Sequence, residues 1–598
     1  MRKKIKWLWQ YYRHYKYVLL VLLLLTPVQA VFQVLLPRML GFVIDFLKSG
    51  IVPTEGMAGK LVETGQSYDL NPSDTFAVTF LIVSFIAVGL YAFVQSHRAW
   101  MNSRFEWLFR QHAFNTITIK GPDFFNRFRT GDLLTRLTDD VADKLSWFAC
   151  SGIFRLYEAL AIVSFIIAMM ISIDPLLTLY TVGPLPLLIF IFFKSASLLD
   201  KRYDLLQVKI SNFSDVMEAC FSGIRVVKAY VREKAQQKSF EKAAMERREA
   251  ELSAVKITAI VDSLYAYVWQ FGIVIVLIAG GWMVIKSSLS LGNLSAFIYY
   301  VVWLVFPMFD IGQFLVKSRQ SAVSIDRLVE LEDVPAMVKE SGTLSANGYV
   351  KGNLSLKNVS FGFATSERKI VQNVSFDIKA GETVALVGKV GSGKSWLVNM
   401  IPRLVDPTGG VISLDGHDLR EYKLEDLRTS IGYVPQEPVL FSDTIRNNIL
   451  FGRKDISDTV LEWAIEISQL KEEISRFPKG LETSIGTRGM SISGGQKQRV
   501  ALARALVGKP KILILDDCTS ALDSRTESLL WERLHEVLPD ITAILITHRP
   551  DTLERADMIH VMEDGSIIES GRHFELMAQE GHYARIYNRY QLEEQVTK

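Results

Sequence analysis

The sequence TVALVGKVGSGKS occupies residues 383–395 and joins an apolar run to a glycine-rich loop. Glycines let consecutive backbone N–H groups close around phosphate oxygens, and the N-terminus of a following helix adds positive potential. Lys394 supplies a mobile charge, and Ser395 offers a hydroxyl to Mg²⁺. An apolar strand before the loop and a helix after it favour this motif over a chance glycine loop. The predicted phosphate-binding residues are Gly388, Lys389, Val390, Gly391, Ser392, Gly393, Lys394 and Ser395.

Two later apolar runs end in polar side chains. Residues 511–515 are followed by Asp516 and Asp517, and residues 541–546 lead to His548. Phosphate-loop folds hold Mg²⁺ with a carboxylate at the end of such a strand, and Asp516 is the better candidate. His548 is a candidate contact for a terminal phosphate. The alternatives are a pair of solvated acids and a structural histidine.

Two further residues complete the candidate nucleotide site. Gln436 follows the apolar run 431–434 and offers a ligand to Mg²⁺ or to a water, and Phe363 offers an aromatic face to a purine. Each is a weak signal without the phosphate loop. Short β-branched strands alternate with amphipathic helices throughout this half, which predicts an α/β domain built on a mostly parallel sheet.

The first half of the chain has the composition of a membrane domain. Hydrophobic residues make up 49% of the chain, and the mean hydropathy is +0.19. With a net charge of only +3, the composition argues against a disordered chain and against a nucleic-acid partner. Three scattered cysteines are too few for a disulfide framework or a zinc site.

Six apolar stretches are candidate membrane-spanning helices, because a helix of ~20 apolar residues crosses the hydrocarbon core of a bilayer. The third is the shortest. They are residues 17–37, 75–96, 159–173, 175–193, 263–285 and 287–309.

Basic residues predict the orientation of these spans. The first 16 residues carry Lys and Arg without any acid, and the segments 98–155 and 194–261 are also rich in basic residues. By the positive-inside rule these segments and the amino terminus lie in the cytoplasm. A cleavable signal peptide with Val28–Ala30 as its cleavage site is the alternative for the first span.

The two long inside segments are expected to extend the spans as cytoplasmic helices. Each contains a break, at Gly121-Pro122 and at Ser222-Gly223, which is either a docking point or an ordinary turn. The expected organisation is therefore a transmembrane domain over residues 1–325, a polar acidic linker over 326–348 and a nucleotide-binding domain over 349–598.

The segment SISGGQKQR, residues 491–499, leads into a predicted helix. It contains Ser493, Gly494, Gly495 and Gln496 and lies between the phosphate loop and the strand that ends in Asp516. This pattern resembles the signature of ATP-binding cassette (ABC) transporters. Six spans followed by one cassette resemble a type IV exporter half-transporter, similar to multidrug-resistance exporters. The resemblance covers the whole chain, and the cassette motifs are its most specific part.

The resemblance implies roles for single residues, with ATP and Mg²⁺ as cofactors. Phe363 corresponds to the adenine-stacking aromatic, Gln436 to the Q-loop residue, Asp516 to the Mg²⁺ carboxylate and His548 to the switch histidine. Residues 520–523, which end at Asp523, correspond to the D-loop. The family binds two ATP molecules between two cassettes, so each site takes Ser493, Gly494 and Gly495 from the opposite chain.

Asp517 departs from the family pattern, in which a catalytic Glu follows the Mg²⁺ carboxylate. The side chain is one methylene shorter, and a mispositioned general base can lose ~10²-fold of its effect. The strand that ends at Asp516, together with the residue after it, corresponds to the Walker B motif of the family, which is degenerate here because it lacks this Glu. A degenerate Walker B with a nearly intact signature resembles one subunit of a heterodimeric exporter whose partner chain carries Glu. The alternative is that Asp517 acts through a shifted water. Thr487 is a second departure, where relatives often have Glu.

The expected function is ATP-driven export of hydrophobic or amphipathic compounds, drug-like or lipid-like. Polar residues in the spans, among them Glu158 and Asp310, are expected to line an aromatic and mildly acidic cavity. The alternatives are a homodimeric exporter with both sites active, and a nucleotide-gated channel or regulatory subunit. The resemblance implies an integral protein in contact with membrane lipid, in the bacterial inner membrane, with both termini cytoplasmic.

Overall fold

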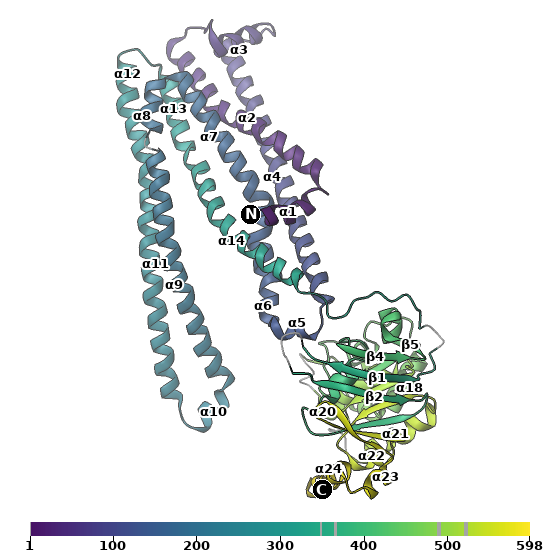
Figure 1. Cartoon of the computed structure of the whole chain (residues 1–598). Coiled ribbons are helices and arrows are strands. Elements are labelled where there is room, and N and C mark those ends of the chain that lie inside the picture. The colour runs from purple at the N-terminus through teal and green to yellow at the C-terminus, as the bar shows by residue number, and fades with distance from the viewer. Residues whose placement is uncertain are drawn as a thin grey trace. The chain divides into compact units, whose positions relative to one another are not determined.

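The computed structural model describes residues 2–597 except 184, 347–349, 364–367, 487–491 and 519–523. The chain forms two compact units (Figure 1). The helical unit comprises Met1–Ile117 and Gly131–Asp333, and the second unit comprises Thr118–Thr130 and Val334–Lys598.

Long helices dominate the helical unit. Helix α4 (Pro72–Thr118) has 47 residues and α11 (Glu233–Ile275) has 43. At 1.5 Å per residue both are roughly twice as long as the hydrocarbon core is thick, so each extends beyond the membrane. The other helices are α1 (Arg2–Tyr12), α2 (Lys16–Ser49), α3 (Gly56–Gln66), α6 (Thr130–Thr135), α7 (Ile153–Ile173), α8 (Pro175–Val182), α9 (Leu185–Ser222), α10 (Ile224–Ala229), α12 (Gly281–Ile285), α13 (Leu291–Trp303) and α14 (Val305–Asp333), with π-helical stretches at Arg136–Ser146, Phe148–Gly152 and Val276–Gly280.

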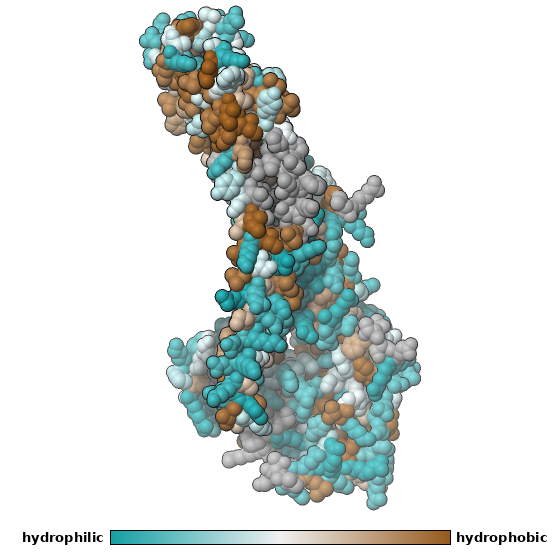
Figure 2. All heavy atoms as spheres, turned by 90° about the vertical axis from the view of Figure 1, so that its left-hand side faces the viewer, coloured by the Kyte–Doolittle hydropathy of each residue, from teal (hydrophilic) through white to brown (hydrophobic). Residues whose placement is uncertain are grey.

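Four of the predicted spans coincide with long apolar helices. Within the described residues, the helical stretches long and apolar enough to cross a membrane are Lys16–Ser49, Pro72–Thr118, Thr130–Ile173 and Leu291–Asp333. The predicted spans 175–193 and 263–285 include positions whose backbone or side chains lie outside the description. Hydrophobic side chains gather on the upper part of this unit and hydrophilic ones prevail lower down (Figure 2).

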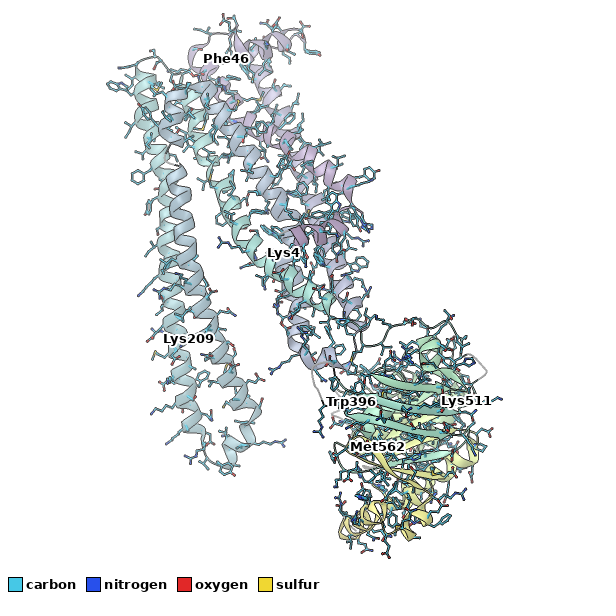
Figure 3. The ribbon with its side chains drawn as sticks, in the orientation of Figure 1. Lys4, Phe46, Lys209, Trp396, Lys511 and Met562 are labelled. Atoms are coloured by element: carbon cyan, nitrogen blue, oxygen red, sulfur yellow. The ribbon has the colours of Figure 1, made fainter. Side chains whose placement is uncertain are left out.

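Both predicted breaks in the cytoplasmic segments are confirmed. Helix α4 ends at Thr118 and the short α5 (Pro122–Arg127) follows, while α9 ends at Ser222 before α10. Helices α9 and α11 pack side by side along their length (Figure 1). Lys209 on α9 donates to Glu246 on α11 at 2.7 Å (Figure 3).

A proline in α2 is compensated by a neighbouring helix. Pro27 has no N–H and cannot bond the carbonyl of Leu23, four residues earlier. The hydroxyl of Tyr157 on α7 donates to that carbonyl at 3.3 Å. Side chains from neighbouring helices often satisfy such carbonyls in membrane helices, where water is absent.

A buried charge network joins three of the apolar helices. Arg98 on α4 donates to Glu158 on α7 at 2.7 Å, and Gln29 on α2 donates to the other carboxylate oxygen at 2.7 Å. Arg98 is only 1% exposed. On the same α7, Arg155 pairs with Asp310 of α14 at 3.3 Å. The expectation of a mildly acidic cavity is therefore wrong for Glu158 and Asp310, because an arginine neutralises each of them.

The second unit contains two β-sheets. One has the order β2-β1-β4-β5 and is antiparallel, and the other has the order β10-β9-β3-β8-β7-β6, in which the strands from β9 to β6 are parallel. The strands are β1 (Leu354–Phe361), β2 (Val371–Ile378), β3 (Thr383–Val387), β4 (Gly409–Leu414), β5 (His417–Asp418), β6 (Ile431–Val434), β7 (Ile512–Asp516), β8 (Thr542–Ile546), β9 (Met558–Glu563) and β10 (Ser566–Gly571).

The core of this unit is the parallel sheet. Every residue of β3, β7 and β8 is buried, which explains why each strand carries a run of four apolar residues in place of an alternating pattern. The helices are α5, α15 (Lys394–Asn399), α16 (Leu424–Thr429), α17 (Ile445–Leu450), α18 (Asp458–Ile467), α19 (Lys471–Arg476), α20 (Gly494–Leu506), α21 (Ser524–Val537), α22 (Pro550–Glu554), α23 (His573–Ala578) and α24 (His582–Thr597). The predicted fold class, a helical membrane domain followed by an α/β domain, is confirmed.

The buried network predicts the effect of removing one partner. Replacing Glu158 by Ala leaves Arg98 charged and buried without its carboxylate, which should cost about 3 kcal/mol of stability. We expect a clear drop in the melting temperature of the detergent-solubilised protein. Glu246→Ala, which breaks the solvated pair with Lys209, is the control and should change the melting temperature little. Equal shifts for the two variants would contradict this interpretation.

Candidate nucleotide site

The site lies where parallel strands end. Strands β3, β8, β7 and β6 are neighbours in register, so their carboxyl ends meet at one edge of the sheet, where open α/β sheets bind ligands. A cavity of about 640 Å³ lies at this edge. The predicted residues that line it are Val390, Gly391, Ser392, Gly393, Lys394, Ser395, Gln436, Asp516, Asp517 and His548.

Glycine is required at both ends of the phosphate loop. Gly388 has φ +150° and Gly393 has φ +99°, a region that other residues rarely adopt. A Cβ at Gly388 would lie 2.2 Å from the carbonyl oxygen of Met562 on β9, and one at Gly393 would lie 2.7 Å from that of Ile370. Figure 3 marks Met562 beside this part of the sheet. The neighbouring backbone therefore fixes the path of the loop.

The side chain of Lys394, the first residue of α15, folds back into the phosphate loop. Its side chain is 8% exposed, and its ammonium donates to the carbonyls of Gly388 at 2.7 Å and Lys389 at 2.9 Å. Burial lowers the pKa of this ammonium, while Asp516 and Asp517 act in the opposite direction. The Lys389 side chain is exposed and pairs with Glu563 at 2.9 Å.

Ser395 and Asp516 provide a donor set that fits Mg²⁺. The Ser395 hydroxyl lies 3.3 Å from a carboxylate oxygen of Asp516, and Gln436 lines the same cavity. Burial raises the pKa of Asp516, with the Ser395 bond opposing that shift. Mg²⁺ keeps several waters and needs only one or two protein oxygens. The described residues contain no cluster of three or more His, Cys, Asp or Glu, as sites for softer metals would require.

Asp517 adopts a left-handed backbone conformation, with φ +47°. Its N–H donates to the carbonyl of Ile546 on β8 at 2.8 Å, and the Gln436 amide donates to its carboxylate at 3.4 Å. Burial raises the pKa of the Asp517 carboxyl, and His548 and Gln436 counteract that shift. The Asp517 side chain therefore starts from a fixed backbone position at the cavity wall.

His548 contacts a residue from the C-terminal helix. Its Nδ1 lies 2.6 Å from the hydroxyl oxygen of Tyr590 on α24, and the two rings meet edge to face at 5.0 Å. Burial lowers the pKa of this imidazole, and Asp517 opposes that effect. Sequence analysis did not identify Tyr590, because it lies 42 residues after His548 and belongs to no motif that we recognised.

The aromatic side of the site contains a tryptophan that sequence analysis missed. Trp396 lines the cavity and stacks on Phe361, with ring centroids 5.4 Å apart (Figure 3). Phe363, the predicted adenine contact, is half-buried and meets Trp396 edge to face at 4.9 Å, but it does not line the cavity. The position of Trp396 directly after Ser395 was the available signal.

The signature residues lie outside this cavity. Ser493 caps α20: its hydroxyl accepts from the Gln496 N–H at 3.3 Å, and its own N–H donates to the Gln496 side chain at 2.9 Å. Ser493 and Gly494 are exposed, and Gly495 and Gln496 are half-buried. Thr487 and the predicted D-loop with Asp523 lie outside the described residues.

The comparisons agree with this arrangement. The ABC transporter family model matches residues 371–520, and the ABC transporter transmembrane region matches residues 19–308. A Bacillus subtilis (strain 168) protein named "Probable multidrug resistance ABC transporter ATP-binding/permease protein YheI" is 30% identical over 99% of this chain and 97% of its own length. The "Uncharacterized ABC transporter ATP-binding protein YknU" of the same organism is 30% identical over 98% of this chain and 97% of its length.

A solved structure, a bacterial Atm1-family ABC exporter with ATP bound, has the same fold. Its TM-score is 0.76 at 24% identity, over 96% of this chain and 98% of that one. The cassette implies ATP binding, and the long apolar helices make this an integral membrane protein. The chain therefore belongs to the ABC transporter family, as an exporter half-transporter that carries its transmembrane region and its cassette in one polypeptide.

Proposed function

We propose that this chain is one subunit of a heterodimeric ABC exporter that drives hydrophobic or amphipathic compounds outward with ATP. The site on its own phosphate loop holds ATP and hydrolyses it slowly. The partner is a second half-transporter with Glu in place of Asp517. ATP on the phosphate loop of the partner is hydrolysed while it contacts the signature residues of this chain.

One observation carries the asymmetry. Asp517 has a single methylene between its carboxylate and a backbone that is tied to β8. A general base must come within hydrogen-bond reach of the attacking water, and a carboxylate withdrawn by about 1.5 Å loses that contact. The groups for binding are present in the same cavity, since Lys394, Ser395 and Asp516 all line it.

The signature supports a dimeric working unit. Ser493 and Gly494 are exposed at the start of α20 and do not line the cavity of their own chain. A second cassette in head-to-tail contact would bring the phosphates of its bound nucleotide to these residues. The capping bonds between Ser493 and Gln496 already hold this helix end in shape. This chain therefore supplies a competent signature to its partner.

The proposed substrate class follows from the helical unit and from the relatives. The intramembrane charges of Glu158 and Asp310 are paired with arginines, which lowers the negative charge that a substrate would meet. The name of YheI describes multidrug resistance. We propose drug-like or lipid-like compounds, with Mg²⁺ held by Ser395, Asp516 and Gln436. We also propose residues 1–325 as the membrane domain, 326–348 as the linker and 349–598 as the cassette, with both termini in the cytoplasm of a bacterial cell.

Lengthening the carboxylate should restore hydrolysis. The purified wild-type chain alone should hydrolyse ATP slowly, and Asp517→Glu should raise its turnover at least about tenfold, because the added methylene brings the base to the water. Steady-state ATPase of the chain in nanodiscs measures this. Asp516→Glu adds the same methylene at the neighbouring acid and should show no gain.

Rapid turnover by the wild-type chain alone would favour the homodimeric exporter. Uptake into inside-out vesicles distinguishes either exporter, heterodimeric or homodimeric, from a channel or regulatory subunit, since only a pump accumulates substrate against its gradient.

Removing the metal carboxylate should separate metal binding from nucleotide binding. Asp516→Asn should abolish the strengthening of ATP binding by Mg²⁺, because an amide carries no charge to hold the cation. The titration is made with ATP in the presence of Mg²⁺ and again with EDTA. Asp455→Asn, at an exposed position outside this cavity, is a control that should bind as wild type does. A normal response to Mg²⁺ in Asp516→Asn would contradict the assignment.

A further inference from the structure

The contact between His548 and Tyr590 connects the nucleotide cavity with the C-terminal helix. Tyr590 is 3% exposed, and its hydroxyl lies 2.6 Å from Nδ1 of His548, whose ring lines the cavity. The edge-to-face packing of the rings at 5.0 Å fixes the plane of the imidazole as well as its distance.

The chemistry of the two groups decides which one donates. A buried phenol keeps its proton, because burial raises the pKa of Tyr590 to about 12. The buried imidazole is neutral near pH 7, since burial lowers its pKa. The phenol then donates to Nδ1, and the single proton of the neutral ring lies on Nε2. In histidine sites, the partner of one ring nitrogen commonly sets the role of the other.

We propose that Tyr590 is a positioning residue that holds His548 in the Nε2–H tautomer, so that the imidazole donates to the terminal phosphate of a bound nucleoside triphosphate. This inference rests on the nucleotide site of the proposed function. It gives α24 a role at that site, because Tyr590 on this helix orients His548. The pocket then distinguishes a triphosphate from a diphosphate, which lacks the phosphate that Nε2–H would reach.

The chain contains a matched pair that serves as a control. Tyr583, on the same helix α24, places its hydroxyl 2.7 Å from Nδ1 of His573, with the rings edge to face at 5.7 Å. Tyr583 is fully buried, and His573 does not line the nucleotide cavity. Loss of this hydroxyl removes the same kind of bond from the same helix without touching His548.

The test compares ATP with ADP on the full-length chain in lipid nanodiscs, by displacement of a fluorescent ATP analogue in the presence of Mg²⁺. Tyr590→Phe should weaken ATP binding about fivefold, as expected for one hydrogen bond, and leave ADP binding unchanged. Tyr583→Phe should leave the ratio of ATP to ADP affinity as in the wild type. In a His548→Ala background, Tyr590→Phe should cause no further loss, because the two residues act as one unit.

Each of the following results would overturn the proposal: an unchanged ATP-to-ADP ratio in Tyr590→Phe, an equal change in Tyr583→Phe, or full additivity with His548→Ala. A loss of fold alone would weaken ATP and ADP together and would also count against it. The readout is binding and not turnover, so it is independent of whether this site hydrolyses slowly. Failure of the heterodimer proposal would instead be seen in the rates of the Asp517 variants.

Discussion

In the proposed heterodimer, the reach of one carboxylate just after the end of β7 limits how fast this cassette hydrolyses ATP. Strand β7 is wholly buried between β6 and β8, so the backbone at Asp516 and Asp517 is held in place by the sheet. The N–H of Asp517 is bonded to β8, and its φ of +47° sets the direction in which the side chain departs. In the proposed mechanism, the single methylene of Asp517 is too short to bring its carboxylate to a hydrolytic water. Lys394, Ser395 and Asp516 line the same cavity, so the proposed limit concerns hydrolysis and not nucleotide binding.

The membrane unit satisfies buried polar groups with partners from neighbouring helices. Glu158 accepts from both Arg98 and Gln29, and the carbonyl freed by Pro27 accepts from Tyr157. Unpaired groups would be costly in lipid, so these contacts constrain how α2, α4 and α7 pack. The pairing with Arg98 also neutralises the negative charge that Glu158 brings into the apolar helices.

Short-range patterns predicted much of the site. The phosphate loop, the strand that ends at Asp516 and the strand before His548 were recognisable because apolar runs adjoin polar ends within a few residues. Phe363, the predicted purine contact, meets Trp396 edge to face, and Trp396 is the aromatic residue that lines the cavity. Tyr590 lies 42 residues from His548, and Arg98 lies 60 residues from Glu158. Tertiary packing alone brings such pairs together, and a single sequence gives no signal for them.

In the proposed heterodimer, the two nucleotide sites turn over at different rates. Vanadate trapping with a photoreactive ATP analogue, applied to this chain assembled with its partner, labels the site that has just hydrolysed its nucleotide. The proposed asymmetry predicts trapped diphosphate on the phosphate loop of the partner and unhydrolysed triphosphate on the loop that contains Lys394. Equal amounts of trapped diphosphate on the two chains would contradict it.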